Sequence, residues 1–404
     1  MLPGGLTPSL SEALVRLSTW IPSFARAAQL LETFTGAKVT EASVRRRTEG
    51  AGAAYVAVQE EEVAAWQRGE KKETLGAAKM MCSVDGAMVP LVGQEWAEVK
   101  TCVIGEVPPL HGAGSEPVKT ERLSYFSRLA EAGVFQEQLL VETQRRGVAT
   151  AAEVACVADG AEWIQRLIDF HRPDAVRILD LPHAAEHLSQ LGQAVYGEGS
   201  AASRAWLAEQ VQQLKEQGPV PLLATLGALA DAHPLPVVHE HLAYLEKRAA
   251  QMHYPAFRAA GWPIGSGIVE SANKLLVEGR LKGSGMHWAR GHVNPMVALR
   301  TVVFNDRWEE AWPQIATRLR EQDGQRRLQR QHAHQVCSPP RAMTPPGPVA
   351  AVALPEAPPD PGPACAAGVK GAVPHRPAPN HPWRHARVGK ARSQPWKPYE
   401  VPKL

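Results

Sequence analysis

The sequence predicts an α/β fold in which a mixed β-sheet is flanked by helices. Three patterns lead to this prediction: strand-like runs that follow one another as a hairpin, strands separated by a helical period, and a long stretch that is almost entirely helical. Hairpins join antiparallel strands, whereas a strand, a helix and a second strand usually form a parallel crossover. A chain with both connections is expected to build a mixed sheet with helices against its faces.

Composition restricts the class of protein further. The chain has 404 residues, of which 44% are hydrophobic and 21% are charged, with a formal net charge of +3. These values are ordinary for a soluble globular protein. We find neither a signal peptide nor an apolar run long enough to span a membrane, so we expect a cytoplasmic protein. The cysteines form no Cys-x-x-Cys pair, which argues against a zinc site or a disulfide framework: they are Cys82, Cys102, Cys156, Cys337 and Cys365.

Residues 1–75 are predicted to form a helical region. Ser23 can cap a helix that Gly36 would end, and Thr40 can cap a second helix. The first helix carries apolar residues at helical spacing: Phe24, Ala27, Ala28, Leu31 and Phe34. The second carries Arg45, Arg46 and Arg47. Two short helices joined by a glycine-containing turn, the second rich in arginine, indicate a helix-turn-helix that binds DNA. The alternative is a plain helical hairpin with a solvated basic face.

Residues 76–190 change to a strand-like period and are predicted to form the first part of the sheet. Met81–Met88 and Ala97–Val107 are expected strands, joined by a connection that contains Gly93. Arg122–Leu129 either forms a third strand or opens a helix that continues to Arg146. The elements expected after it are a strand at Glu153–Val157, a helix at Ala161–Phe170 and a strand at Ala175–Leu179.

The remaining chain divides into two helical parts and a tail. Residues 191–260 are predicted to be helical, and further helices in 261–325 are expected to return to the sheet. Residues 335–404 differ in composition. From residue 339 onward, 17 of the chain's 34 prolines occur, and nine Lys or Arg accompany three Asp or Glu. Such a segment cannot bury enough apolar surface to fold, so we expect a disordered, basic tail.

Three carboxylates lie at the ends or in the middle of these elements. Asp85 interrupts the apolar alternation of a strand, and Asp159 ends another strand; a glycine follows each. Glu270 lies where a Gly/Ser turn runs into a helix, beside Asn273 and Lys274. Three apolar residues of that helix are expected to pack inward: Ile268, Ala272 and Leu275. Asp-Gly is also an ordinary turn signal, so a purely structural role for each aspartate stays open.

Phosphoryl transfer would explain these residue types. Mg²⁺ prefers oxygen ligands and keeps several waters, so a few carboxylates suffice to bind it. Two such ions, about 3.5–4 Å apart, serve the attacking and the leaving oxygen of an in-line displacement. Two aspartates at neighbouring strand ends and a glutamate on a helix are able to form a site for two Mg²⁺ or Mn²⁺ ions.

At these residues the chain resembles bacterial insertion-sequence DDE transposases of the ISKra type, which are related to the Mutator-like transposases. The similar strings follow one another in family order from about residue 6 to residue 320, and HPWR at His381–Arg384 in the tail is also similar. They are LTPSLSEALVRLSTWIPSFARAAQLLETFTG, SVDGAMVP, VADGAEWI, LDLPHAAEHL, GWPIGSGIVESANK and GRLKGSGMHW.

The resemblance implies an RNase H-like fold and DNA strand cleavage and transfer by a magnesium-bound triad, which Asp85, Asp159 and Glu270 match. It also implies that residues 191–260 are an α-helical insertion between two parts of the catalytic core, 76–190 and 261–325. Related transposases extend further upstream, so we expect part of the N-terminal DNA-binding region to be missing here. Two transposon ends have to be paired, which favours a homo-oligomer, and a bacterial, nucleoid-associated location follows.

The identity of the second metal ligand has two candidates. The family carries a Cys/Asp-x-x-His element between its second and third acids, which matches Asp180 and His183. Asp180 also ends a strand, but Asp159 is favoured because the family places its second acid in an Asp-Gly string. His183 is expected to orient DNA, to assist proton transfer near the scissile phosphate, or only to cap the following helix.

Double-stranded DNA, both transposon ends and target, is the expected partner. Most of the affinity should come from phosphate neutralisation by Lys and Arg, so binding should weaken steeply with salt. Trp288 is a candidate for stacking on an unpaired base, with core packing as the alternative. The candidate contacts are Arg45, Arg46, Arg47, Lys274, Arg280, Lys282, Trp288 and Arg290.

Two other functions stay open. The first is a nuclease of the same fold that cuts DNA without strand transfer. The second is a catalytically inactive DNA-binding protein that descends from a transposase. Products of a joining assay separate the first from a transposase, and metal-dependent cleavage separates the second.

Overall fold

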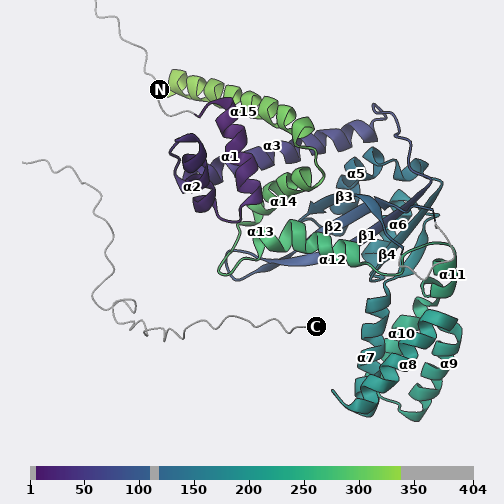
Figure 1. Cartoon of the computed structure of the whole chain (residues 1–404). Helices are drawn as coiled ribbons and strands as arrows, with labels where there is room; N and C mark the ends of the chain where they lie inside the picture. The colour runs from purple at the N-terminus through teal and green to yellow at the C-terminus, as the bar shows by residue number, and fades with distance from the viewer. Residues whose placement is uncertain (1–5, 110–117, 338–404) are drawn as a thin grey trace, which may run out of the picture. The chain divides into compact units, whose positions relative to one another are not determined.

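The computed structural model describes residues 6–109 and 118–337 (Figure 1). The tail predicted from residue 335 lies outside the described residues beyond Cys337, and so does the HPWR string at His381–Arg384. Among the described helices, none is both long and apolar enough to cross a membrane. The strands are β1 (Lys79–Pro90), β2 (Trp96–Glu106), β3 (Glu121–Arg128), β4 (Glu153–Ala158) and β5 (Val176–Leu179).

The strands form one mixed sheet in the order β3-β2-β1-β4-β5. Strand β2 is antiparallel to both β1 and β3, while β1, β4 and β5 run parallel. The prediction of an α/β fold with a mixed sheet is therefore confirmed. The hairpin between β1 and β2 turns at Gly93, whose φ of 92° lies in the left-handed region that glycine adopts without strain.

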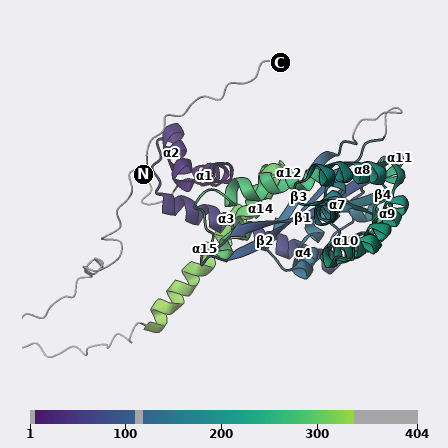
Figure 2. The same cartoon turned by 90° about the horizontal axis from the view of Figure 1, so that it is seen from below.

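Helices cover both faces of the sheet (Figure 2). On one face lie α4 (Ala132–Gln138), α5 (Leu140–Arg145) and α6 (Glu162–His171), where Phe135 and Ile164 pack on Val84. On the other face, Val89 packs against α12 (Gly267–Ala272) and α14 (Arg290–Phe304). Successive side chains of a strand point to opposite faces, so Asp85 belongs to the same face as Val89.

The segment with two open interpretations, Arg122–Leu129, is a strand, and it extends the sheet beyond β2. The helices expected from Leu123 onward begin only at Ala132. Pairing with β2 explains the difference, because Phe126 and Ser127 are buried in the sheet. The strand carries two aromatic residues, Tyr125 and Phe126, and aromatic side chains fit a pleated surface well.

The N-terminal helices are α1 (Pro8–Trp20), α2 (Phe24–Thr35) and α3 (Glu41–Gln67). The predicted caps are confirmed: Ser23 and Thr40 accept backbone N–H bonds at the starts of α2 and α3, and Gly36 ends α2 with a φ of 70°. The prediction of two short helices was wrong, because α3 has 27 residues. Its inner side packs on α14 and on α15 (Trp308–Cys337), so α1–α3 share one compact unit with the sheet.

Between β5 and α12 the chain is helical, as the sequence predicts. Helices α7 (Leu181–Tyr196), α8 (Ala201–Gln217), α9 (Pro219–Ala232) and α10 (Pro236–Lys247) pack on one another, and Figure 1 shows them gathered beside the sheet. The short α11 (Tyr254–Ala259) leads back toward α12. Leu188, Leu214, Leu226 and Leu242 are buried between these helices, in a core that reaches β4 and β5.

The free edge of β3 is closed by two asparagines from the α14 region. The side chain of Asn305 accepts from the Tyr125 N–H at 2.8 Å and donates to its C=O at 2.9 Å. Asn294 makes the same pair of bonds to Leu129, at 2.7 and 3.1 Å. An edge strand otherwise presents unpaired backbone groups to other chains. The two amides therefore satisfy this edge and fix α14 on the sheet.

Replacement of Asn305 by Ala is expected to lower the free energy of unfolding by about 1–3 kcal/mol, because it removes two hydrogen bonds to partly buried backbone groups. Urea unfolding followed by circular dichroism measures the change. Asn305→Asp keeps the acceptor for the Tyr125 N–H but loses the donor to its C=O. Its free energy of unfolding is expected to lie between those of the wild type and Asn305→Ala. A midpoint that does not move in either variant would contradict this account of the edge.

Candidate active site

Three aspartates line up at one edge of the sheet because of the strand register. Val84 of β1 pairs with Ala158 of β4, and Ala158 pairs with Leu179 of β5. These are the last parallel pairs, and the residue after each is an aspartate: Asp85, Asp159 and Asp180. Clefts at the carboxyl ends of parallel strands, where neighbouring strands diverge, are common ligand sites. The sequence predicts Asp159 and Asp180 at strand ends and Asp85 within a strand, and the register places Asp85 directly after the last pair that β1 makes with β4.

Asp85 lies half-buried on β1 beneath α12. Its Oδ2 accepts a hydrogen bond of 2.9 Å from Nδ2 of Asn273. Burial raises the pKa of the Asp85 carboxyl; the Gly86 N–H and Asn273 oppose the increase, and the charges of Asp159 and Glu270 add to it. Asp159 and Glu270 are therefore close enough to Asp85 for their charges to disfavour its ionised form.

Asp159 starts a tight turn that the helical segment between β5 and α12 holds in place. Its Oδ1 accepts from the Ala161 N–H at 2.9 Å, and its backbone oxygen accepts from the Tyr244 hydroxyl of α10. Arg248 donates through Nε and Nη2 to the Gly160 oxygen, at 3.1 and 2.7 Å. Gly160 has a φ of 77°, and a Cβ there would lie 2.5 Å from Nε of Arg248. The turn thus requires glycine and is fixed by α10.

Asp180 is buried and has its carboxylate oxygens engaged by the backbone. Oδ1 accepts from the Ser266 N–H at 2.6 Å, and Oδ2 accepts from the His183 N–H at 3.2 Å as the N-cap of α7. Burial raises the pKa of this carboxyl, these N–H groups oppose the increase, and the charge of Glu270 adds to it. Asp180 therefore joins the start of α7 to the segment that leads into α12.

Glu270 is exposed on α12, which lies against β1 and β2. After α12 the chain forms a π-helix at Asn273–Glu278 and then α13 (Gly279–Leu281). The wider turn changes which residues face the core: Leu276 and Val277 are buried, whereas Leu275 is 37% exposed. The prediction that Leu275 packs inward was wrong for this reason. Insertions of a π-turn are frequent at functional sites, and this one begins at the residue that contacts Asp85.

His183 occupies the first turn of α7, but its ring does not cap the helix, because Asp180 does. The ring lies beside Tyr244, with ring centroids 5.8 Å apart, and beside His187 at 5.0 Å. His187 stacks on Tyr244 at 3.7 Å. His183 therefore lies beside Tyr244, and the Tyr244 hydroxyl in turn donates to the backbone oxygen of Asp159.

The contribution of Tyr244 and Arg248 was missed in the sequence. Their spacing of four residues puts them on one side of α10, but nothing in the sequence links that side to Asp159. Asn273 was noted only as a neighbour of Glu270; its bond to Asp85 depends on how the helix lies on the sheet.

The four acids have no basic partner of their own. Within residues 6–109 and 118–337, neither the predicted triad nor Asp180 forms an ion pair. In the same residues, no three His, Cys, Asp or Glu side chains are arranged as they stand to hold a metal ion. Joint coordination would therefore need side-chain rotation. The exposed Glu270 is free to rotate, and Asp159 uses only Oδ1.

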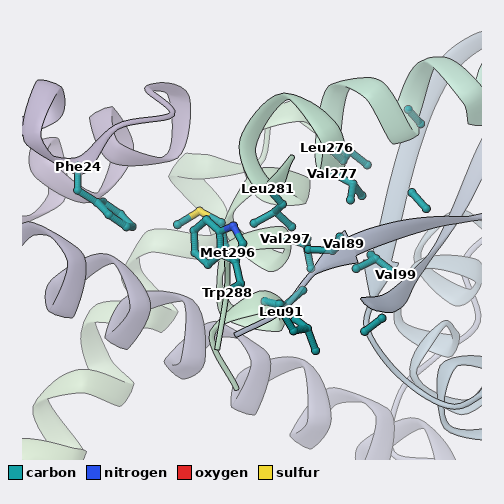
Figure 3. Packing of buried hydrophobic residues seen from close by; sticks show 14 of the residues in the cluster. Phe24, Val89, Leu91, Val99, Leu276, Val277, Leu281, Trp288, Met296 and Val297 are labelled. Carbon is teal, nitrogen blue, oxygen red and sulfur yellow. The ribbon is translucent and has the colours of Figure 1, made fainter. Parts of the chain in front are cut away.

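The candidate DNA contacts fall into two groups. Arg45, Arg46, Lys274, Lys282 and Arg290 are exposed, and Arg47 is half-buried. Arg280 and Trp288 are buried, at 1% and 7% exposure, and both pack with Phe24 of α2. Figure 3 labels Phe24 and Trp288. The Trp288 ring is therefore part of the core in this conformation rather than a surface for a base.

No family model matches the sequence, and no curated protein is significantly similar to it. The resemblance to insertion-sequence transposases rests on the quoted motifs, so the function that it implies is taken up as a proposal. The geometry of the acids stands independently of that resemblance.

Replacement of Asp85 by Asn is expected to stabilise the metal-free protein at neutral pH. The folded-state pKa is raised above the ordinary 3.8, so the folded state binds this proton more tightly than the unfolded state. The contribution of Asp85 to stability is therefore present at low pH and declines as the pH rises from about 3.8 through the raised pKa. Above that window the variant lacks a desolvated charge that the wild type carries.

Urea unfolding in EDTA between about pH 4 and pH 8 measures this difference. The gap between Asp85→Asn and the wild type should widen as the pH rises. Glu209→Gln on α8, an exposed acid without an ion pair among the described residues, should show no such trend. A variant that is less stable than the wild type at every pH would contradict the prediction.

Proposed function

We propose that the chain is a DDE transposase, a metal-dependent phosphoryl-transfer enzyme that cleaves DNA at the ends of its own insertion sequence and joins the strands to a target. The observation that carries the proposal is that the charges of Asp159 and Glu270 act on the half-buried Asp85, while none of the three forms an ion pair among the described residues. Carboxylates gathered in this way repel one another unless a cation lies between them. The motifs that resemble insertion-sequence transposases support the same conclusion.

The donor set fits Mg²⁺ or Mn²⁺. These hard cations prefer carboxylate oxygens together with water. Asp85, Asp159 and Glu270 would hold them, and the exposure of Glu270 leaves room for water and substrate. When bound, two such ions stabilise the attacking and the leaving oxygen of an in-line displacement at phosphorus.

The surrounding residues would orient these acids. Asn273 holds one oxygen of Asp85, and Tyr244 and Arg248 fix the turn that carries Asp159. Side chains held by neighbours lose little freedom when the substrate binds, which favours catalysis by positioning. Water attacks the scissile phosphate in the first step, and the 3′-hydroxyl that this bond cleavage frees attacks a target phosphate in the second.

The architecture and the surface charges support the same reading. The mixed sheet with helices on both faces suits an RNase H-like core, and α7–α11 suit the helical insertion that the resemblance implies. Exposed lysines and arginines offer contacts to the phosphates of duplex DNA: Arg45, Arg46, Lys274, Lys282 and Arg290. Pairing of two transposon ends calls for at least two copies of the chain.

Replacement of Asp85, Asp159 or Glu270 by Ala is expected to reduce metal-dependent cleavage by about a hundredfold to a thousandfold or more, because each change removes a charge that the transition state needs. The assay measures nicking and strand joining on the DNA that flanks the chain's own gene, with Mg²⁺, with Mn²⁺ and with EDTA. Circular dichroism shows whether each variant is folded, and Glu209→Ala is the matched control, with activity equal to the wild type.

Three results would change the assignment. Nicks without joined products would indicate a nuclease. DNA binding by the wild type without any metal-dependent cleavage would indicate an inactive descendant of a transposase. Cleavage that persists in all three variants would remove the acids from the mechanism.

Substitutions of Asp159 and Asp180 are expected to differ in their effects on stability as well as on cleavage activity. Asp180→Ala loses a hydrogen bond to a buried backbone N–H and another to a partly buried one, so its free energy of unfolding should fall by about 2–4 kcal/mol. Asp159→Ala loses one bond to a partly buried N–H and should fall by about 1 kcal/mol or less, yet lose cleavage. Near-normal cleavage by Asp159→Ala, together with loss in a folded Asp180→Ala, would transfer the second ligand position to Asp180.

A further inference from the structure

Arg280 is a buried cation, and two of its nitrogens have no hydrogen-bond partner in the part of the chain that the structure describes. Its side chain is 1% exposed, and its guanidinium lies between two aromatic rings, 4.5 Å from the Phe24 centroid and 5.0 Å from that of Trp288. Neither Nε nor Nη2 has a hydrogen-bond partner among the described residues, and the same is true of the Trp288 indole nitrogen. Burial lowers the pKa of Arg280 to about 10. A buried donor that is left unpaired costs free energy.

A cavity of about 470 Å³ adjoins this cation. Its walls come from the start of α2, the first turns of α3 and the segment between α13 and α14, which includes Gly285, Met286 and His287. Phe24, Arg280 and Trp288 also line it, and Figure 3 shows Phe24 and Trp288 on the same side of the buried cluster. Gly285 adopts a φ of 74°, so this wall turns where only glycine does so without strain.

The acids of the cavity already have partners. Glu41 pairs with Arg45 at 3.4 Å, and Glu49 pairs with His292 at 3.0 Å. Glu49 influences the pKa of Arg280 but makes no ion pair with it. The unpaired buried atoms on this wall, which belong to Arg280 and Trp288, are all N–H donors. A ligand that matches them carries anionic oxygens.

We propose that this cavity binds a phosphate group through Arg280 and the Trp288 N–H, and that in the working enzyme this group belongs to the backbone of the bound DNA. The second half of the statement rests on the proposed function. Positions 270 and 280 are separated by almost three turns of the continuous helical path through α12, the π-helix and α13, which is roughly 15 Å at about 1.5 Å per residue. The exposed Lys274 lies between them. A strand whose scissile phosphate is at the acids reaches the cavity within a few nucleotides.

The competing interpretation is that Arg280 only packs between Phe24 and Trp288. The two interpretations differ in what Arg280→Met does to the ligand-free protein. An unpaired buried charge replaced by an apolar chain of similar length leaves stability unchanged or increased. Loss of a packing cation between two rings decreases it.

The experiment uses the full chain in EDTA, so it does not depend on metal-driven cleavage. Inorganic phosphate, thymidine 5′-monophosphate and a short single-stranded oligonucleotide are titrated separately, and the melting temperature and the fluorescence anisotropy are followed. Each ligand should raise the melting temperature of the wild type. Arg280→Met should melt no lower than the wild type without ligand, and should bind the oligonucleotide about tenfold or more weakly. Arg26→Met, which removes an exposed charge from α2 outside the cavity, should bind as the wild type does.

Trp288→Phe is the second variant, because it keeps a ring and removes only the N–H. It should weaken binding of all three ligands while the fold is retained. The proposal is overturned if the wild type binds none of the three, or if both variants bind them as the wild type does. Binding of inorganic phosphate with an unchanged oligonucleotide affinity in Arg280→Met would overturn the assignment to DNA. If the ligands bind as expected but the wild type shows no metal-dependent cleavage, the transposase proposal is contradicted. The phosphate site is then still supported.

Discussion

The candidate site depends on the register of three parallel strands. Because Val84, Ala158 and Leu179 are paired across β1, β4 and β5, the aspartates that follow them arrive at one edge. A slip of one residue would turn Asp85 to the opposite face, against α4 and α6, and away from α12. The apolar alternation on both faces of β1 prevents such a slip, since Val84 and Val89 are buried on opposite sides. The packing of the sheet and the placement of its acids are thus one constraint.

Elements far apart in the sequence then stabilise that edge. α12 supplies Glu270, and the π-helix supplies Asn273, which donates to Asp85. Tyr244 of α10 and Arg248, which follows this helix, donate to the backbone oxygens of the Asp159–Gly160 turn. Asp180 joins the start of α7 to the segment before α12 by accepting from the His183 and Ser266 N–H groups. Burial raises the pKa of the Asp85 and Asp180 carboxyls even though each accepts hydrogen bonds that oppose the increase. Such unrelieved charge lowers the stability of a fold, and proteins commonly retain it at sites that bind or react.

Local signals in the sequence predicted local structure well. The caps at Ser23 and Thr40, the end of α2 at Gly36 and the acids at strand ends all depend on a few neighbouring residues. What failed depends on contacts across the fold. The length of α3 follows from its packing on α14, where Gly52 is so close that a Cβ would lie 2.1 Å from the Pro295 oxygen. The exposure of Leu275 follows from a π-helix. No pattern of apolar spacing predicts the hydrogen bond from the Tyr244 hydroxyl to the backbone oxygen of Asp159.

The paired hydrogen bonds that Asn294 and Asn305 make to the backbone at the β3 edge limit how two copies of the chain can associate. A sheet with an open outer strand can recruit the same strand of a neighbouring molecule and grow into a continuous intermolecular ladder. Here Asn305 and Asn294 occupy the backbone groups of Tyr125 and Leu129 that such a neighbour would need at these two positions. A second copy that approached this edge would therefore have to displace α14 before its own strand could pair there.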